Sequence, residues 1–220
     1  MSPQDNSWIA PWVAKKLIDT KEVTGASVLS DLFIRVERRD GPSFVVAAVS
    51  VPCVEASLIE SLTSKQPRPS FILNVARESQ VSAEALTRSM DEEVPIGRMG
   101  DLLRAVRLDD VTTYKDPEIA FVERGFDQHS SISSYERLDE RRYRIKRHSR
   151  PSVIIALLNE YEVTADSVRV ARERYGPFAW AVLTNPNSRI TANAEEVSET
   201  LDCRLLSWRE FYKAANSVDS

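Results

Sequence analysis

Two stretches of this sequence, IRVERRDGPSFVVAAVSV (residues 34–51) and YRIKRHSRPSVIIALLNE (residues 143–160), resemble each other when Ile34 is placed on Tyr143. The same offset aligns SAEAL (82–86) with TANAE (191–195) and VPIGRMGDLLRA (94–105) with CRLLSWREFYKA (203–214). FILN (71–74) matches VLTN (182–185) after a slip of two residues. Similar blocks at one offset indicate an internal duplication. We therefore expect two tandem units, residues 1–108 and 109–220. Two residues whose numbers differ by 109, as those of Ile34 and Tyr143 do, are called repeat equivalents.

The pattern of apolar residues predicts the same elements in each unit. RYRIK (142–146) alternates charged and apolar residues, as a half-buried strand does. VIIALL (153–158) and FVVAAV (44–49) are apolar throughout, which is typical of a central strand covered on both faces. A helix over 165–175 with Thr164 as N-cap follows, then strand AVLTN (181–185), a helix capped near Thr191, strand CRLLS (203–207) and a helix from Trp208.

This order predicts an α/β fold of two tandem repeats. Strands that alternate with helices favour parallel pairing, and the early hairpin adds an antiparallel edge. Each repeat should therefore be a mixed β-sheet flanked by helices, and we expect the two repeats to pack as a pseudo-dimer. In the first helix, an apolar stripe of Trp8, Ile9, Trp12, Val13 and Leu17 should face the core or the seam between the units.

Composition narrows the classes of function. The chain has 220 residues, is 42% hydrophobic and carries a net charge of −4, so a nucleic-acid site would have to be a local basic patch. Two cysteines and two histidines are too few for a disulfide framework or a zinc cluster. The start MSPQDNSWIAPWV does not resemble a signal peptide, and no apolar run is long enough to span a membrane. We expect a cytoplasmic protein with no membrane partner.

The second unit resembles the restriction-endonuclease-like fold, in particular its Mrr-type branch. The resemblance rests on GFDQH (125–129), on the strand pair in YRIKRHSRPSVIIALL, and on AVLTNPNSRITANAEE (181–196) followed by LLSWREF (205–211). The first unit resembles a more diverged copy. The resemblance implies a nuclease fold, and such proteins often occur in bacterial defence, which is an association rather than an argument from the site.

The chemistry that the resemblance implies needs carboxylates and a lysine around the central strand. Two carboxylates would hold Mg²⁺ or Mn²⁺, which activates water, and the lysine would orient the nucleophile. The expected positions on the central strands are apolar in both units: Ala156 and Leu158, and Ala47 and Val49. The sequence therefore argues against catalysis and predicts no cofactor. Acidic residues that a divergent metal site would have to use are Asp31, Glu140, Glu160 and Glu162.

A basic run over residues 141–150 is the candidate nucleic-acid interface. Along a strand, Arg142, Arg144 and Lys146 would project from one face, and with Arg147 they could follow a phosphate backbone. Basic residues on an edge strand also block association between sheets, and Glu136, Asp139 and Glu140 are close enough in sequence to pair with them.

Three functions remain open from the sequence. The leading hypothesis is a non-catalytic protein of two degenerate nuclease-like units that binds a protein partner, or that regulates or scaffolds an assembly. The second is a DNA- or RNA-binding module that uses the basic hairpin. The third is a divergent nuclease dependent on Mg²⁺ or Mn²⁺.

Overall fold

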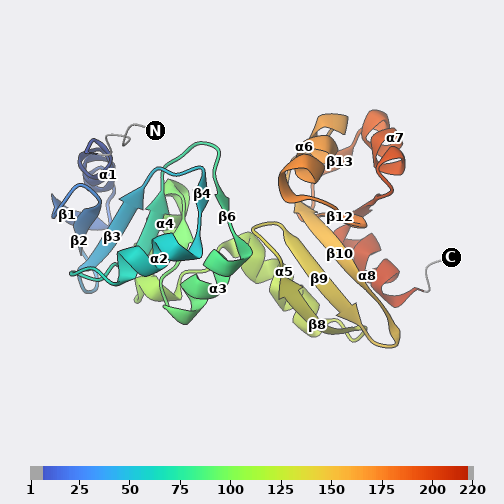
Figure 1. Ribbon diagram of the computed structural model, residues 1–220, viewed down its shortest axis with the longest axis horizontal. Helices are drawn as coiled ribbons and strands as arrows, with labels where there is room; N and C mark the ends of the chain where they lie inside the picture. Colours follow the sequence, from blue (N-terminus) through green and yellow to red (C-terminus); the bar gives the residue numbers. More distant parts are fainter. Residues whose placement is uncertain (1–6, 218–220) are drawn as a thin grey trace. The chain divides into compact units, whose positions relative to one another are not determined.

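The computed structural model describes residues 7–217, which form two compact units divided between Asp116 and Pro117 (Figure 1). We call residues 7–116 unit 1 and residues 117–217 unit 2. The first six residues, part of the start considered above for a signal peptide, lie outside the described range.

Each unit has eleven principal elements in the same order. Those of unit 1 are α1 (Ile9–Ile18), β1 (Val23–Val28), β2 (Phe33–Arg38), β3 (Phe44–Val49), β4 (Cys53–Val54), α2 (Ala56–Thr63), β5 (Phe71–Asn74), β6 (Gln80–Val81), α3 (Ala83–Asp91), β7 (Ile96–Gly97) and α4 (Met99–Ala105), followed by a 3₁₀ turn, Val111–Thr113. Those of unit 2 are α5 (Pro117–Gln128), β8 (Ile132–Arg137), β9 (Arg142–Arg147), β10 (Arg150–Leu158), β11 (Glu162–Val163), α6 (Ala165–Tyr175), β12 (Trp180–Leu183), β13 (Arg189–Ile190), α7 (Ala192–Thr200), β14 (Arg204–Ser207) and α8 (Trp208–Asn216).

Both units contain a five-stranded mixed sheet with the same topology. The strand order is β1-β2-β3-β5-β7 in unit 1 and β8-β9-β10-β12-β14 in unit 2. Neighbours among the first three strands of each sheet are antiparallel. β5 and β12 then pair in parallel with the central strands β3 and β10, and β7 and β14 pair in parallel with β5 and β12. Each unit also has a short parallel pair, β4 with β6 and β11 with β13, which the sequence did not predict. The predicted mixed sheets with flanking helices are confirmed.

The offset between the repeats is the same in the register of every strand pair. Phe33 lies opposite Ala47, and their repeat equivalents Arg142 and Ala156 lie opposite each other in unit 2. The parallel pairs agree, so Phe71 occupies the place of Trp180 rather than that of Val182. The two-residue slip expected for FILN and VLTN is therefore wrong. It arose from matching Asn74, which ends β5, with Asn185, which lies two residues beyond the end of β12. The backbone register instead makes Asn74 the repeat equivalent of Leu183.

Helices cover both faces of each sheet, which explains the uninterrupted apolar central strands. In unit 1, α1 and α4 pack on one face and α2 and α3 on the other, and all six residues of β3 are buried. In unit 2, α5 and α8 pack on one face and α6 and α7 on the other. The predicted helix starts are confirmed, since the side chains of Thr164 and Thr191 cap α6 and α7.

Helix α1 buries only part of its predicted apolar stripe. Ile9, Val13 and Leu17, which lie one helical turn apart, are fully buried in the core of unit 1. Trp8 and Trp12 are 52% and 40% exposed, so they do not belong to the core of unit 1, and the alternative that they face the seam between the units stays a prediction. They lie beside the buried stripe on the helix surface, and two buried alanines of α1 complete the face that contacts the sheet.

Contacts of residues 109–116 explain why unit 1 extends beyond the boundary expected from the duplication. Val111 is buried in the core that α1 and α4 share, and the Tyr114 hydroxyl donates a hydrogen bond of 2.7 Å to Asp101. Arg38 also donates to the carbonyl oxygen of Asp109 at 3.0 Å. The segment therefore completes unit 1 before α5 begins.

Candidate binding site in unit 2

The central-strand positions expected to carry catalytic groups are buried and apolar. Ala47 and Ala156 are fully buried, and Val49 and Leu158 are 3% and 4% exposed. Their side chains belong to the cores under α2 and α3 and under α6 and α7. Hydrocarbon side chains cannot ligate a divalent cation, which takes oxygen ligands. The residues at these positions therefore do not fit the metal that the resemblance implies.

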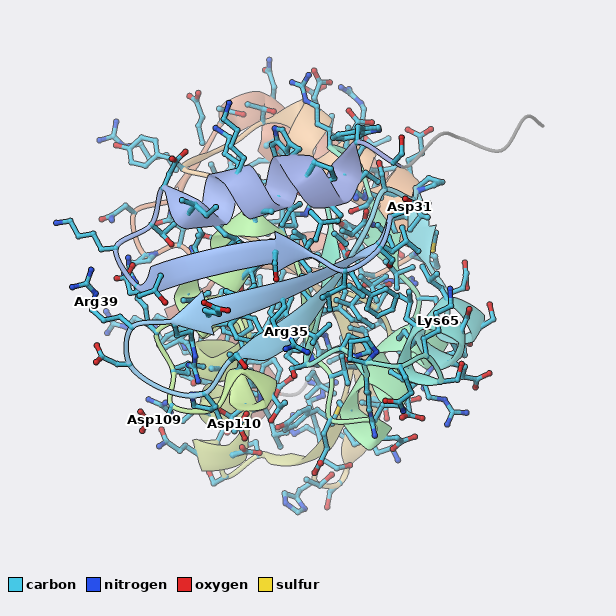
Figure 2. All side chains as sticks on the ribbon, turned by 90° about the vertical axis from the view of Figure 1, so that its left-hand side faces the viewer. Asp31, Arg35, Arg39, Lys65, Asp109 and Asp110 are labelled. Carbon is cyan, nitrogen blue, oxygen red and sulfur yellow. The ribbon has the colours of Figure 1, made fainter. Side chains whose placement is uncertain are left out.

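The acidic candidates lie at strand ends. Asp31 is exposed in the turn between β1 and β2, at the end of unit 1 where α1 begins (Figure 2). Glu140 occupies the same turn in unit 2, between β8 and β9, and Glu160 and Glu162 follow β10. Within residues 7–217, no three acidic, histidine or cysteine side chains come together in a group that could hold a metal ion.

Arg142 and Arg144 of the basic strand β9 form ion pairs within unit 2. Arg142 is bound to Asp139 by a 2.7 Å ion pair and donates to the carbonyl oxygen of Pro177 at 3.1 Å, and its side chain is only 19% exposed. Arg144 forms an ion pair with Glu136, which lies opposite it on β8. Lys146, further along the strand, is exposed. Acidic neighbours thus neutralise part of the charge available to a phosphate backbone.

Arg147 is not part of the exposed basic face, which corrects its assignment as a nucleic-acid contact. It is 6% exposed, and its guanidinium group lies over the ring of Trp180, 5.1 Å from the centroid. Its Nε donates to the carbonyl oxygen of Pro151 at 3.1 Å. Successive residues of a strand point to opposite faces, so Arg147 points into the core when Lys146 points outward.

A polar network links three elements at the carboxyl ends of the parallel strands of unit 2. Glu118, in the first turn of α5, accepts a hydrogen bond of 2.8 Å from Nη1 of Arg141 and one of 2.6 Å from the Thr184 hydroxyl. Arg141 precedes β9 and Thr184 follows β12, and backbone hydrogen bonds join both residues to the end of β10, at Leu157 and Leu158. The Glu118 side chain is 16% exposed and that of Arg141 is 32% exposed.

The charge state of Glu118 is set by these partners. Burial raises the pKa of the Glu118 carboxyl, whereas the charge of Arg141 and hydrogen bonds from Thr184, Arg141 and Asn159 lower it. The second group of effects is larger, because the net pKa lies below the ordinary value of 4.5. Glu118 is therefore a carboxylate at neutral pH and holds the Arg141 guanidinium in place.

A pocket of about 330 Å³ lies next to this network, between the end of β10 and one face of α6. Its polar lining includes Arg141, Glu160, Arg174 and Tyr175, and its apolar lining includes Leu157. Ligands of open α/β sheets bind outside the carboxyl ends of the parallel strands, which is where this pocket lies. Among the predicted site residues, the structure thus places Glu160 in a pocket.

Comparisons with known proteins leave the family open. Searches of protein-family models, of curated proteins and of solved structures find no match to this chain. None of the helices between residues 7 and 217 is long and apolar enough to cross a membrane.

Proposed function

We propose that this chain is a non-catalytic binding protein, built from two degenerate restriction-endonuclease-like units, that acts through contact with a protein partner. The observation that carries the proposal is the burial of Ala47, Val49, Ala156 and Leu158 at the positions where such a nuclease needs an acid and a lysine. A metal-dependent mechanism would have to rebuild its ligands on other elements, and the acidic candidates do not gather into a cation site among the described residues.

A surface of unit 1 has the character of a protein contact. Trp8 and Trp12 project from α1 with their rings edge to face, 6.2 Å between centroids. Val28, the last residue of β1, and Leu29, the next residue, are 45% and 41% exposed. Strand β1 runs back toward the start of α1. We call the exposed pair Trp8 and Trp12 the tryptophan surface. Tryptophan is enriched at the energetic centres of protein interfaces, because its ring buries a large area at a low cost in conformational entropy.

The first test of the proposal asks whether the chain cuts nucleic acid. Purified protein is incubated with labelled single- and double-stranded DNA and RNA in Mg²⁺, in Mn²⁺ and in chelator. We expect no metal-dependent cleavage, and cleavage would contradict the proposal. Binding without cleavage that weakens steeply with salt and is lost in Lys146→Ala would assign the function to β9 instead.

The second test asks whether the tryptophan surface selects a protein. Affinity capture from an extract of the source cells is compared between the wild type and the double variant Trp8→Ala/Trp12→Ala. Phe121→Ala is the matched control, because Phe121 is the repeat equivalent of Trp12 in unit 2 and is 49% exposed. A protein captured in stoichiometric amount by the wild type and the control, but not by the double variant, supports the proposal. Equal capture by all three proteins would contradict the proposal that the tryptophan surface binds the partner.

A further inference from the structure

Several residues that line the pocket beside β10 differ in polarity from their repeat equivalents in unit 1. The two units have the same fold, so these residues can be compared directly. Three of its polar positions have apolar repeat equivalents in unit 1: Arg141, Glu160 and Ser167 correspond to Leu32, Val51 and Leu58. In unit 1 all three equivalents pack against the core under α2 and α3. The same sheet and helices therefore accommodate apolar side chains where unit 2 has a polar pocket.

The network behind the pocket follows the same pattern. Glu118, Arg141 and Thr184 stand where unit 1 has Ile9, Leu32 and Val75, all of which pack in its apolar cores. Partly burying an ion pair is costly, and apolar side chains of similar volume are often at least as stable. Since unit 1 folds with the apolar set, the fold does not require the polar one. The fold alone therefore does not explain why unit 2 has polar residues at these three positions.

The chemistry of the lining indicates a class of ligand. Arg141 and Arg174 bring two guanidinium groups to the pocket, and the guanidinium fork matches the geometry of a carboxylate or phosphate group. Tyr175 adds a phenol, which is protonated at neutral pH, and burial raises its pKa further above the ordinary value of 10.0. Glu160 adds a carboxylate to the lining, which suits a hydrogen-bond donor on the ligand.

We infer that the pocket formed by β10, α6 and Arg141 binds a small molecule that carries an oxoanion, either a carboxylate or a phosphate, beside a hydrogen-bond donor. Glu118 acts as a positioning residue, since it holds Arg141 from the side of α5 and is not itself part of the pocket lining. The volume of about 330 Å³ is at the lower end of the range for small-molecule sites. This site is independent of the proposed contact through the tryptophan surface.

The test uses the full chain and four probes at constant ionic strength. Inorganic phosphate and O-phosphoserine form the phosphate arm, malate and glutamate form the carboxylate arm, and chloride is the control for ionic strength. Amide chemical shifts are followed by NMR during each titration. We expect saturable shifts confined to residues 141 and 157–160 and to α6, in at least one arm. The arm that saturates identifies the anionic group.

Three variants locate the binding. Arg141→Leu/Glu160→Val/Ser167→Leu installs the unit 1 side chains, and we expect it to abolish saturable binding while circular dichroism shows a folded protein. Arg174→Gln should weaken binding by about tenfold, because it removes one charge-assisted hydrogen-bond donor. Arg169→Gln is the control, since Arg169 is on α6 but pairs with Asp166 outside the pocket. If the triple variant does not fold, Arg174→Gln decides alone.

Two outcomes would overturn the inference. One is the absence of saturable shifts in both arms. The other is binding that is as tight in the folded triple variant, or in Arg174→Gln, as in the wild type.

Discussion

Arg38 and Arg147, which are repeat equivalents, are buried in the same way in the two units. Each donates its Nε to the carbonyl oxygen of the proline four residues further along the chain, Pro42 at 2.9 Å and Pro151 at 3.1 Å. Each also directs Nη1 at a carbonyl oxygen near a helix C-terminus, that of Val106 just after α4 at 3.3 Å and that of Ala214 in the last turn of α8 at 3.5 Å. A cation at a helix C-terminus is favourable because the carbonyl groups there carry partial negative charge.

This burial predicts that Arg147 serves stability rather than recognition. We expect Arg147→Ala to lower the free energy of unfolding by about 3 kcal/mol, because it leaves buried carbonyl groups without their donor. Lys146→Ala, at the exposed position just before it, should change the free energy of unfolding by less than about 0.5 kcal/mol. Urea unfolding followed by circular dichroism measures both. Equal values for the two variants would refute the structural role of Arg147.

The fold was largely predictable because the duplication repeats the apolar pattern. FVVAAV and VIIALL form the central strands β3 and β10, as expected, because a strand covered on both faces is typically apolar throughout. The alignment of FILN with VLTN was wrong because it matched identical side chains and not positions in the strand register. Asn74 is the repeat equivalent of Leu183, because Asn74 pairs with Val49 of β3 and Leu183 pairs with Leu158 of β10.

The candidate site was not predictable in the same way, because the repeats are not similar at its residues. The positions that matter are those at which the repeats differ in polarity, such as Leu32 against Arg141. Only the structure brings Glu118, Arg141 and Thr184 together, from three elements far apart in the sequence. The expected basic surface was also incomplete from sequence alone, because the ion pairs of β9 with acidic neighbours depend on turn geometry and on strand register.

Replacing the polar network by its unit 1 counterpart tests whether the fold needs it. We expect Glu118→Ile/Arg141→Leu/Thr184→Val to leave the free energy of unfolding unchanged or to raise it by about 1–3 kcal/mol. Arg141→Leu alone should lower it by about 1–3 kcal/mol, because Glu118 then loses its cation in a partly buried place. Urea unfolding of both variants checks the contrast. A triple variant less stable than the single one would mean that the network is structural.

The pH dependence of stability reports the Glu118 carboxylate. Its pKa is lowered in the folded state, so it contributes stability above its unfolded pKa, near the ordinary value of 4.5, and that stability is lost as the pH falls through the folded pKa. The stability difference between the wild type and Glu118→Gln should therefore be constant near pH 6 and shrink below about pH 4.5. Glu173→Gln, at an exposed position on α6, controls for the loss of a surface carboxyl group. A difference between the wild type and Glu118→Gln that does not change with pH would contradict the charged pair.

Two glycines in helices should respond to alanine with opposite signs. A Cβ atom on Gly125 of α5 would lie 2.6 Å from Cζ2 of Trp208 and still closer to the Tyr212 hydroxyl, and Trp208 is held by neighbouring rings. We expect Gly125→Ala to lower the free energy of unfolding by about 1–3 kcal/mol, because overpacking outweighs the gain in helix propensity. Gly100→Ala in α4 should raise it by about 0.5–1 kcal/mol, since its Cβ would meet only the flexible Arg104 side chain at 3.8 Å. Thermal unfolding of both variants measures the signs, and a stabilising Gly125→Ala would mean that α5 and α8 do not pack as closely as described.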